Sequence, residues 1–231
     1  MSEPELVKQR YQRREERDAD HYYNRLLPSV YLSVQERQRA IIRLFNNNTI
    51  SPVSEKKVLE IGCGAGSNLL ELVTLGFSPK NLVGNELLEE RVARARERLP
   101  QAIQVLAGDA STLNLEPQSF DIVYQSTVFT SILDDAFQQK LADQMWTLLR
   151  PGGGILWYDF TFNNPNNPDV RGVSLSRVAS LFPEGKLQSK RVTLAPPLSR
   201  RVTKIHPSLY NICNTLPFLR THLLCWIEKP K

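Results

Sequence analysis

The sequence lacks an apolar run of the roughly 18 residues that a membrane-spanning helix needs. Its first residues also lack the basic stretch followed by an apolar stretch that marks an export signal. Cysteine is scarce as well: Cys63, Cys213 and Cys225 lie far apart and show no C-x-x-C spacing, so neither a disulfide framework nor a zinc site is expected. These absences favour a cytoplasmic protein in a reducing compartment.

Acidic residues are scarce in the last third of the chain. The net charge is +5, but residues 160–231 hold 11 Lys and Arg against 3 Asp and Glu, whereas residues 51–159 hold 9 against 14. A basic end beside an acidic middle indicates an anionic partner: a phosphorylated or nucleotide-linked small molecule, an acidic glycan or lipid, nucleic acid, or the surface of a membrane. The alternative is that these charges only keep the surface soluble.

The pattern of apolar residues predicts one α/β domain. A chain of 231 residues with 41% hydrophobic residues is enough for one sizeable core. Predicted strands alternate with predicted helices, which is typical of a parallel sheet of the Rossmann-like kind. After a first strand that ends at Ile61, strands are expected at 81–86, 103–107, 120–125, 154–160, 187–194 and 219–227, and helices at 67–76, 88–98, 134–149 and 174–182.

Two regions stand apart from this alternation. Residues 1–50 form a helical extension, charged over 3–23 and amphipathic over 31–46, and we expect both parts to pack over the mouth of the ligand site. Residues 51–231 form the α/β domain, with an insertion at about 196–217 before the final strand. The Asn-rich stretch 46–52 is typical of a linker.

A glycine-rich turn follows the first predicted strand. Gly62, Gly64 and Gly66 separate that strand from a helix, and this arrangement is typical of a nucleotide site because glycine lets a ligand approach the backbone closely. A dinucleotide fingerprint needs another glycine where this chain has Ser67. Glu60 lies two residues before Gly62; its carboxylate disfavours a pyrophosphate and suits a ligand that carries an ammonium group and a sulfonium.

Two further acidic residues follow at strand ends. Glu86 ends the second strand, 26 residues after Glu60, near the interval at which doubly wound folds place a carboxylate on a ribose. The next strand runs into Gly108, Asp109 and Ala110. Because the carboxyl ends of parallel strands meet at one edge of the sheet, we expect these residues around a single site.

These motifs together resemble the class I S-adenosylmethionine-dependent methyltransferases. The run from Glu60 to Gly66 matches their E/D-x-G-x-G-x-G motif, Phe120–Val123 resembles their F-D-x-V motif, and Leu149–Gly153 resembles the L-(K/R)-P-G-G turn before strand five. The resemblance implies a seven-stranded, mostly parallel sheet with an antiparallel last strand, and S-adenosylmethionine as cofactor with S-adenosylhomocysteine as product. It implies these cofactor-binding residues: Glu60, Gly62, Cys63, Gly64, Gly66, Glu86, Leu87, Asp109, Ala110 and Gln125.

In this family Glu86 matches the residue that accepts from both ribose hydroxyls, and Asp109 the residue that meets the adenine amino group. The charged segment near the N-terminus offers a lid over the same site. Tyr11 is a candidate to cover the cofactor. Arg14 is a candidate to bind the carboxylate of its methionine part, because a guanidinium group can donate two parallel hydrogen bonds to a carboxylate. The alternative is a solvated charged helix. Cys63 is assigned no chemistry.

Methyl transfer to a hydroxyl requires removal of a proton. Asp159, near the end of strand five, is the best-placed base, with His21 and His206 as rivals. The alternative for Asp159 is that it orders the Asn- and Pro-rich loop behind it by accepting from backbone donors. By position alone, the acceptor wall is expected to include Tyr22, Tyr23, Phe129, Asn163, Asn164 and Arg171.

The absence of two motifs narrows the range of candidate methyl acceptors. Methyltransferases that act on the amines of DNA bases share a D/N-P-P-Y/F motif after the fourth strand. This chain has Gln125–Val128 at that place, so a DNA-base amine is not the expected acceptor. Asp134 and Asp135 lie at the expected start of a helix, where capping explains them better than a metal does, so no metal is predicted.

Three functions remain open at this point. The favoured one is O-methylation of a small polar acceptor, a glycan or a sugar nucleotide, which a weaker resemblance of residues 156–160 and 194–198 to bacterial polysaccharide-biosynthesis methyltransferases supports. The second is methylation of RNA or protein docked on the basic last third; nucleic acid is the less favoured partner, and peripheral contact with a membrane stays open. The third is a non-catalytic protein that binds S-adenosylmethionine as a regulator.

Overall fold

The computed structural model describes residues 1–15, 24–165 and 167–231, which build one seven-stranded sheet in the order β3-β2-β1-β4-β5-β7-β6. Strands β1 to β5 are parallel, and β7 runs antiparallel between β5 and β6. This confirms the Rossmann-like α/β prediction. The strands are Val58–Ile61 (β1), Leu82–Glu86 (β2), Gln104–Ala107 (β3), Phe120–Ser126 (β4), Leu149–Phe160 (β5), Lys186–Leu194 (β6) and Arg220–Glu228 (β7).

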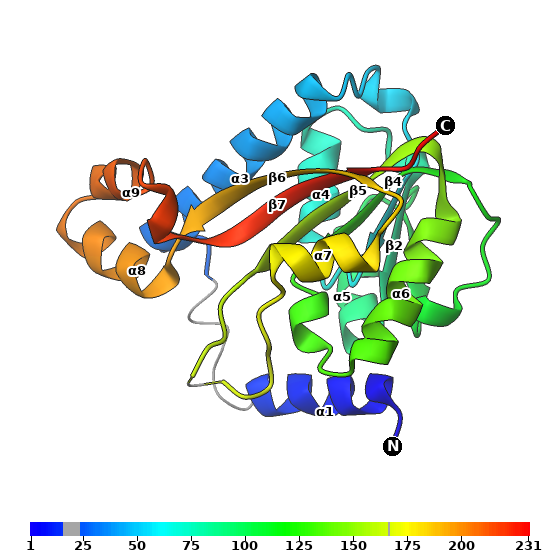
Figure 1. Ribbon diagram of the computed structural model, residues 1–231, viewed down its shortest axis with the longest axis horizontal. Coiled ribbons are helices and arrows are strands. Elements are labelled where there is room, and N and C mark those ends of the chain that lie inside the picture. Colours follow the sequence, from blue (N-terminus) through cyan, green and yellow to red (C-terminus); the bar gives the residue numbers. More distant parts are fainter. Residues whose placement is uncertain (16–23, 166) are drawn as a thin grey trace.

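Helices cover both faces of the sheet (Figure 1). On one face α6 (Asp135–Leu148) and α7 (Leu175–Leu181) pack on a core that includes Leu59, Val123 and Trp157. On the other face α3 (Pro28–Asn47), α4 (Ser67–Thr74) and α5 (Glu89–Arg98) enclose a second core. The sheet separates the two cores because side chains alternate between its faces along each strand.

The N-terminal extension does not act as one unit. Helix α1 (Glu3–Glu15) lies at the carboxyl ends of the strands, and its Val7 belongs to the core of α6 and α7. Helix α3 instead places Ala40, Ile41 and Phe45 in the core of the opposite face. Helix α1 therefore lies where both segments were expected, whereas α3 packs on the opposite face of the sheet.

The predicted ends of most elements agree with the structure within one or two residues, although α3 begins at Pro28, three residues before the predicted start, and β5 differs more. Strand β5 begins at Leu149 and includes the Pro-Gly-Gly-Gly segment that was expected as a turn. This segment is held in the sheet because Leu149 pairs with Phe120, while the amide of Gly152 donates to the carbonyl of Lys229 at 2.8 Å. Gly154 is required there, since a Cβ would lie 2.0 Å from the Trp226 ring.

The insertion before β7 forms two short helices, α8 (Pro196–Ile205) and α9 (Ser208–Cys213). They follow the carboxyl end of β6 and project beyond the sheet (Figure 1). Within the described ranges, no helix combines the length and apolar character that crossing a bilayer requires.

Candidate cofactor site

A cavity of about 240 Å³ lies at the carboxyl ends of β1, β2 and β4, beneath α1. This is the edge at which open α/β sheets bind ligands. Eight of the predicted cofactor residues line it: Tyr11, Gly62, Cys63, Gly64, Glu86, Leu87, Asp109 and Ala110. The sequence motifs thus come together at one place in space.

The three glycines of the turn serve two purposes. All have positive φ angles, +65° at Gly62, +55° at Gly64 and +80° at Gly66. A Cβ at Gly62 would lie 2.6 Å from Val128, and one at Gly66 would lie 2.7 Å from Leu99, so these two are needed for packing. At Gly64 no atom lies within 4 Å of that position, which leaves the backbone open to the cavity.

Glu86 ties the end of β2 to this turn. Its Oε2 accepts from the amide of Gly64 at 2.8 Å, and its Oε1 accepts from the amide of Leu88 at 2.9 Å. Each carboxylate oxygen has a second lone pair. Glu86 can therefore accept from two ribose hydroxyls while it holds the turn in place.

Asp109 stands on the other side of the cavity, just after β3. Its Oδ1 accepts from the amide of Ser111 at 2.8 Å and its Oδ2 from the Ser111 hydroxyl at 2.9 Å, so it is fixed at the start of a short 3-10 helix. Gly108 before it has φ +115° and open space where a Cβ would be. A flat base can approach the backbone at this point.

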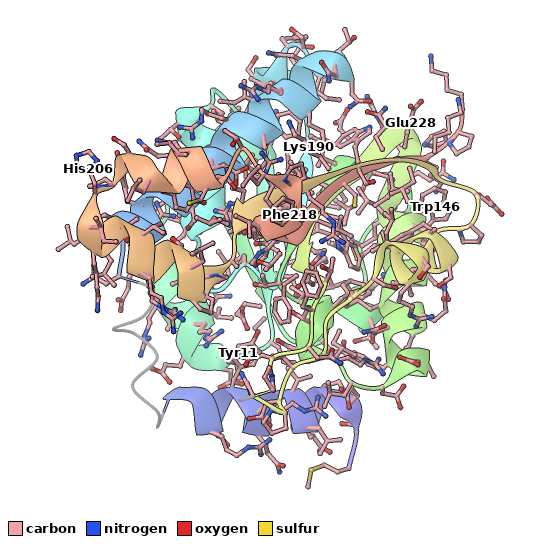
Figure 2. The ribbon with its side chains drawn as sticks, turned by 60° about the vertical axis from the view of Figure 1, so that its left-hand side comes forward. Tyr11, Trp146, Lys190, His206, Phe218 and Glu228 are labelled. Atoms are coloured by element: carbon pink, nitrogen blue, oxygen red, sulfur yellow. The ribbon has the colours of Figure 1, made fainter. Side chains whose placement is uncertain are left out.

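Helix α1 roofs the cavity. Tyr11 lines it, and the guanidinium of Arg91 on α5 lies 4.3 Å from the centre of the Tyr11 ring. Figure 2 shows Tyr11 on the side of α1 that faces the sheet. Arg10 is buried, pairs with Glu3 and donates to the carbonyl of Ser131 at 3.1 Å. This contact fastens the roof to the segment that follows β4.

Glu60 does not line the cavity. It is fully buried on the face of the sheet that packs on α4, where its Oε1 accepts from Asn68 Nδ2 at 2.7 Å and its Oε2 has no partner. Burial raises the pKa of this carboxyl to about 8. A cation brought to the free oxygen would favour the charged form.

Arg37 of α3 completes this second polar cluster. One of its terminal nitrogens, Nη2, donates to Asn68 at 2.8 Å and to Glu71 at 3.0 Å, while its buried Nε has no partner. An unpaired acceptor on Glu60 and an unpaired donor on Arg37 thus lie on either side of Asn68. Both unpaired atoms are buried outside the cavity lining, so this cluster belongs to the packing of α3 and α4 on the sheet. Arg14, the predicted carboxylate ligand, lies in α1, but its side chain is outside the described part of the structure.

Asp159 supports the segment after β4 and does not line the cavity. It is fully buried, its Oδ2 accepts from the amide of Thr130 at 3.2 Å and its Oδ1 from the amide of Phe160 at 3.1 Å. Burial raises the pKa of this carboxyl to about 7. The geometry favours the loop-ordering interpretation, although the loop it orders is Phe129–Ser131.

Gln125 has a similar role beside it. Its Oε1 accepts from the amide of Val128 at 3.2 Å, so Gln125 shapes the turn after β4 without lining the cavity. Gly66 also lies outside the lining.

The structure does not gather the predicted acceptor wall at the cavity. Phe129 is fully buried, with its ring centre 4.5 Å from that of Trp157, so its placement on an acceptor wall is wrong and it belongs to the core. Asn163 accepts from the amide of Gly172, and Arg171 pairs with Asp135, which places both in the loop after β5. The carbonyl of Asn164 accepts from the amide of Asn167 in that loop.

The remaining predicted residues are placed as follows. His21, Tyr22 and Tyr23 lie outside the described residues. His206 is exposed at the corner between α8 and α9 and does not line the cavity, so its role as a rival base is not supported. Asp134 caps α6 by accepting from the amide of Phe137 at 2.7 Å, as expected. Among the described residues, no three His, Cys, Asp or Glu side chains cluster as metal ligands.

Sequence reasoning missed much of the cavity lining. Ser126, Thr127 and Val128 begin three residues after the F-D-x-V motif, at the end of the same strand, so a search past that motif would have found them. Arg91 lies in the first turn and a half of α5, one helical turn from Leu87. Gly108 was expected beside Asp109, and Ile61 lies within the glycine motif. No sequence signal marks the others, which packing alone brings in: Pro4, Val7, Asn85, Ser131, Ile132, Phe137 and Leu141.

A family model of a methyltransferase domain matches residues 58–153, the part of the chain that supplies the glycine turn, Glu86 and Asp109. This part of the chain is a class I S-adenosylmethionine-dependent methyltransferase domain. The open backbone at Gly64 and Gly108 and the fixed carboxylates of Glu86 and Asp109 fit the family's cofactor.

Relatives and solved structures agree with this assignment. The chain is 28% identical over 162 residues to trans-aconitate 2-methyltransferase of Afipia carboxidovorans, which covers 70% of this chain and 57% of the relative. In fold, the methyltransferase domain resembles N-methyltransferase NodS of Bradyrhizobium japonicum, with a TM-score of 0.62, 18% identity and coverage of 85% and 96%. It also resembles phosphoethanolamine N-methyltransferase 2 of Haemonchus contortus bound to S-adenosylmethionine, with a TM-score of 0.61, 17% identity and coverage of 84% and 52%. The chain spans 57% or less of the curated relatives it matches first.

Proposed function

We propose that the protein transfers the methyl group of S-adenosylmethionine to a hydroxyl of a small polar acceptor, a free metabolite or a glycan or sugar nucleotide, and releases S-adenosylhomocysteine. The observation that carries this proposal is the roof over the cavity. Helix α1 is held by the contacts of Arg10 with Ser131 and of Tyr11 with Arg91, and it covers a cavity of about 240 Å³. A covered cavity of this size suits a small acceptor better than a folded macromolecule.

The chain's own residues divide the work of holding the cofactor. Glu86 and Asp109 would receive the ribose and the adenine amino group of the cofactor. When bound, the cofactor supplies an electrophilic methyl carbon on a sulfonium. The roof then excludes water and the fixed contacts align the acceptor with the methyl carbon, which is where most of the rate comes from in such a transfer.

Asp159 has a positioning role in this proposal. It holds the amide of Thr130, and the next residue, Ser131, lines the cavity and binds Arg10. The Asp159 carboxyl therefore sets the backbone on which the acceptor and the roof rest. The hydroxyl proton of the acceptor leaves to solvent water, directly or relayed through a hydroxyl of the cavity lining such as Ser126, which passes on its own proton as it accepts the new one.

The acceptor class rests on this geometry, because the printed names of the relatives differ in it. They include trans-aconitate, sterol and tRNA methyltransferases. The decisive experiment is a screen of cell-extract fractions with methyl-labelled S-adenosylmethionine, separated by size. Label in a small, base-stable product supports the proposal. Label only in RNA or protein supports methylation of a macromolecule docked on the basic last third of the chain.

Binding of the cofactor is tested separately by calorimetry. S-adenosylmethionine and S-adenosylhomocysteine should both bind, and NAD should not. Glu86→Ala should weaken binding at least about tenfold, since hydrogen bonds to a charged group are worth about 1.5–3 kcal/mol each. Glu89→Ala, an exposed carboxylate three residues further along, is the matched control. Tight binding without any methylated product in the screen would favour the regulator.

A further inference from the structure

The α8–α9 hairpin and the segment that joins it to β7 carry large apolar side chains that the protein leaves in water. Ile205 is 78% exposed, Phe218 74%, Ile212 62% and Leu216 44%. The hairpin itself is well anchored, because Tyr210 is fully buried and the Ser199 hydroxyl donates to the carbonyl of Ser29 at 3.4 Å. The four exposed side chains are therefore not a sign of poor packing, and we call them together the apolar tip.

The chain segment that carries the apolar tip is rich in cations. No Asp or Glu occurs from Gly185 to Ile227, a stretch with seven Lys and Arg: Lys186, Lys190, Arg191, Arg200, Arg201, Lys204 and Arg220. Arg201 and Lys204 of α8 are exposed, as are Lys190 and Arg191 of the edge strand β6. The carboxylate that faces this region from α3, Glu36, already accepts from the amide of Thr193 at 2.9 Å. Exposed apolar groups set among exposed cations complement a surface that is negative outside and apolar within.

The apolar tip lies at the same end of the sheet as the cavity. Strand β6 runs parallel to β5, since both are antiparallel to β7, and Val192 and Phe160 both pair with His222. The hairpin that follows β6 therefore extends from the carboxyl edge. In Figure 2, His206 at the corner of the hairpin lies at the opposite end of the molecule from Trp146 and Glu228.

From these observations we propose that the α8–α9 hairpin docks the protein on an anionic membrane surface, with the apolar tip in the headgroup region and the cavity edge turned toward the lipid. A membrane fits better than nucleic acid because Tyr210, the one tyrosine of the hairpin, is buried, and three of the four exposed apolar residues are aliphatic and offer no stacking face. This inference does not depend on the identity of the methyl acceptor.

Sedimentation with lipid vesicles tests the proposal. The protein should bind vesicles of phosphatidylcholine with phosphatidylglycerol, bind phosphatidylcholine alone much more weakly, and lose affinity when salt rises from about 0.1 M to about 0.5 M. Ile212→Ser/Phe218→Ser should weaken binding at least about tenfold. Arg201→Gln/Lys204→Gln should weaken it by roughly 10- to 30-fold, because each surface cation contributes about fivefold.

Matched control variants distinguish the effect of the hairpin on vesicle binding from the effects of net charge and of exposed apolar surface elsewhere. Lys80→Gln/Lys140→Gln removes the same two charges from exposed positions on the rest of the domain, and Ile42→Ser removes an exposed aliphatic side chain of α3. Both should bind like the unchanged protein, and circular dichroism should show all four variants folded. Binding of S-adenosylmethionine should be equal in all, which keeps this test distinct from that of the methyl transfer.

Three results would overturn the proposal. The first is equal binding to charged and uncharged vesicles, or to neither. The second is a stable dimer in light scattering that Ile212→Ser/Phe218→Ser dissociates, since the apolar tip would then join two copies of the chain. The third is tight binding of single-stranded RNA that Arg201→Gln/Lys204→Gln abolishes and Ile212→Ser/Phe218→Ser leaves unchanged.

Discussion

Single residues of the glycine turn determine whether a ligand fits. At Gly62 and Gly66 a Cβ would collide with neighbouring side chains. At Gly64 a Cβ would point into open space, where a ligand can approach the backbone. This distinction depends on the direction of a Cβ at each glycine, and the sequence motif does not reveal that direction. Each glycine therefore makes a different prediction.

Replacing Gly64 by alanine should lower affinity for S-adenosylmethionine at least about tenfold, because the new methyl group enters the cavity. It should also cost about 1 kcal/mol of stability, since φ is +55° there. Gly152→Ala is the control: its φ is +73° and its Cβ would meet only Lys231 at 3.5 Å. Calorimetry and urea unfolding should show the same stability loss in both variants and the affinity loss only in Gly64→Ala.

Asp159 makes the second prediction at this scale. In Asp159→Asn the side-chain amide can accept from one of the amides of Thr130 and Phe160 but not from both, so the segment after β4 should loosen. We expect hydrogen exchange at Thr130 and Ser131 to rise and kcat to fall modestly. The pH profile of kcat should keep its shape. Loss of an ionisation near pH 7 from that profile would instead make Asp159 a base.

Elements far apart in the chain form the roof of the site. Arg10 reaches Ser131, and the guanidinium of Arg91 stacks on Tyr11, so α1, α5 and the segment after β4 meet over the cavity. The roof depends on a few side-chain contacts. Its stability can therefore be changed without unfolding the domain.

Arg10→Ala should release α1. It leaves the carboxylate of Glu3 without its buried partner, and loss of one member of such a pair costs about 3 kcal/mol. Hydrogen exchange of α1 should accelerate, and S-adenosylmethionine should dissociate at least about fivefold faster in stopped-flow displacement. Lys8→Ala, an exposed cation of the same helix, should change neither rate. Equal dissociation rates in both variants would show that α1 does not close the site.

At the scale of the whole molecule, buried ionisable groups make stability depend on pH. Burial raises the pKa of Glu60 to about 8 and of Asp159 to about 7, so the folded protein keeps protons that the unfolded chain has already released above about pH 4. Stability from these two groups falls as pH rises toward 8. His222 acts oppositely below its ordinary pKa of 6.5, because burial lowers its pKa to about 4. The carboxyl effect is therefore clearest between pH 6.5 and 8.

The free energy of unfolding should thus decrease between these pH values. In Glu60→Gln the slope should be smaller by up to about 1.4 kcal/mol per pH unit, the value for one proton. Arg37, Glu71 and Glu86 surround Glu60 and stay in place. Urea unfolding across the pH range measures the slope, and Glu89→Gln, which is exposed, should leave it unchanged.

The sequence by itself determined the parts of this protein that are local. The glycine turn, Glu86 and Asp109 each lie at the end of a strand, and parallel strands bring their carboxyl ends to one edge whatever packs around them. Their meeting at one cavity therefore followed from spacing, whereas the identity of the cofactor followed from the resemblance of these motifs to the class I methyltransferases.

Only the tertiary structure decided the rest. It turned Glu60 to the far face beside Arg37, buried Phe129 against Trp157, and set Arg10 on Ser131, 121 residues away along the chain. Each depends on which way a side chain points or on how distant segments pack, and neither is encoded in a short motif. The roof, the support of the acceptor side and the exposed apolar tip of the α8–α9 hairpin are all of this second kind.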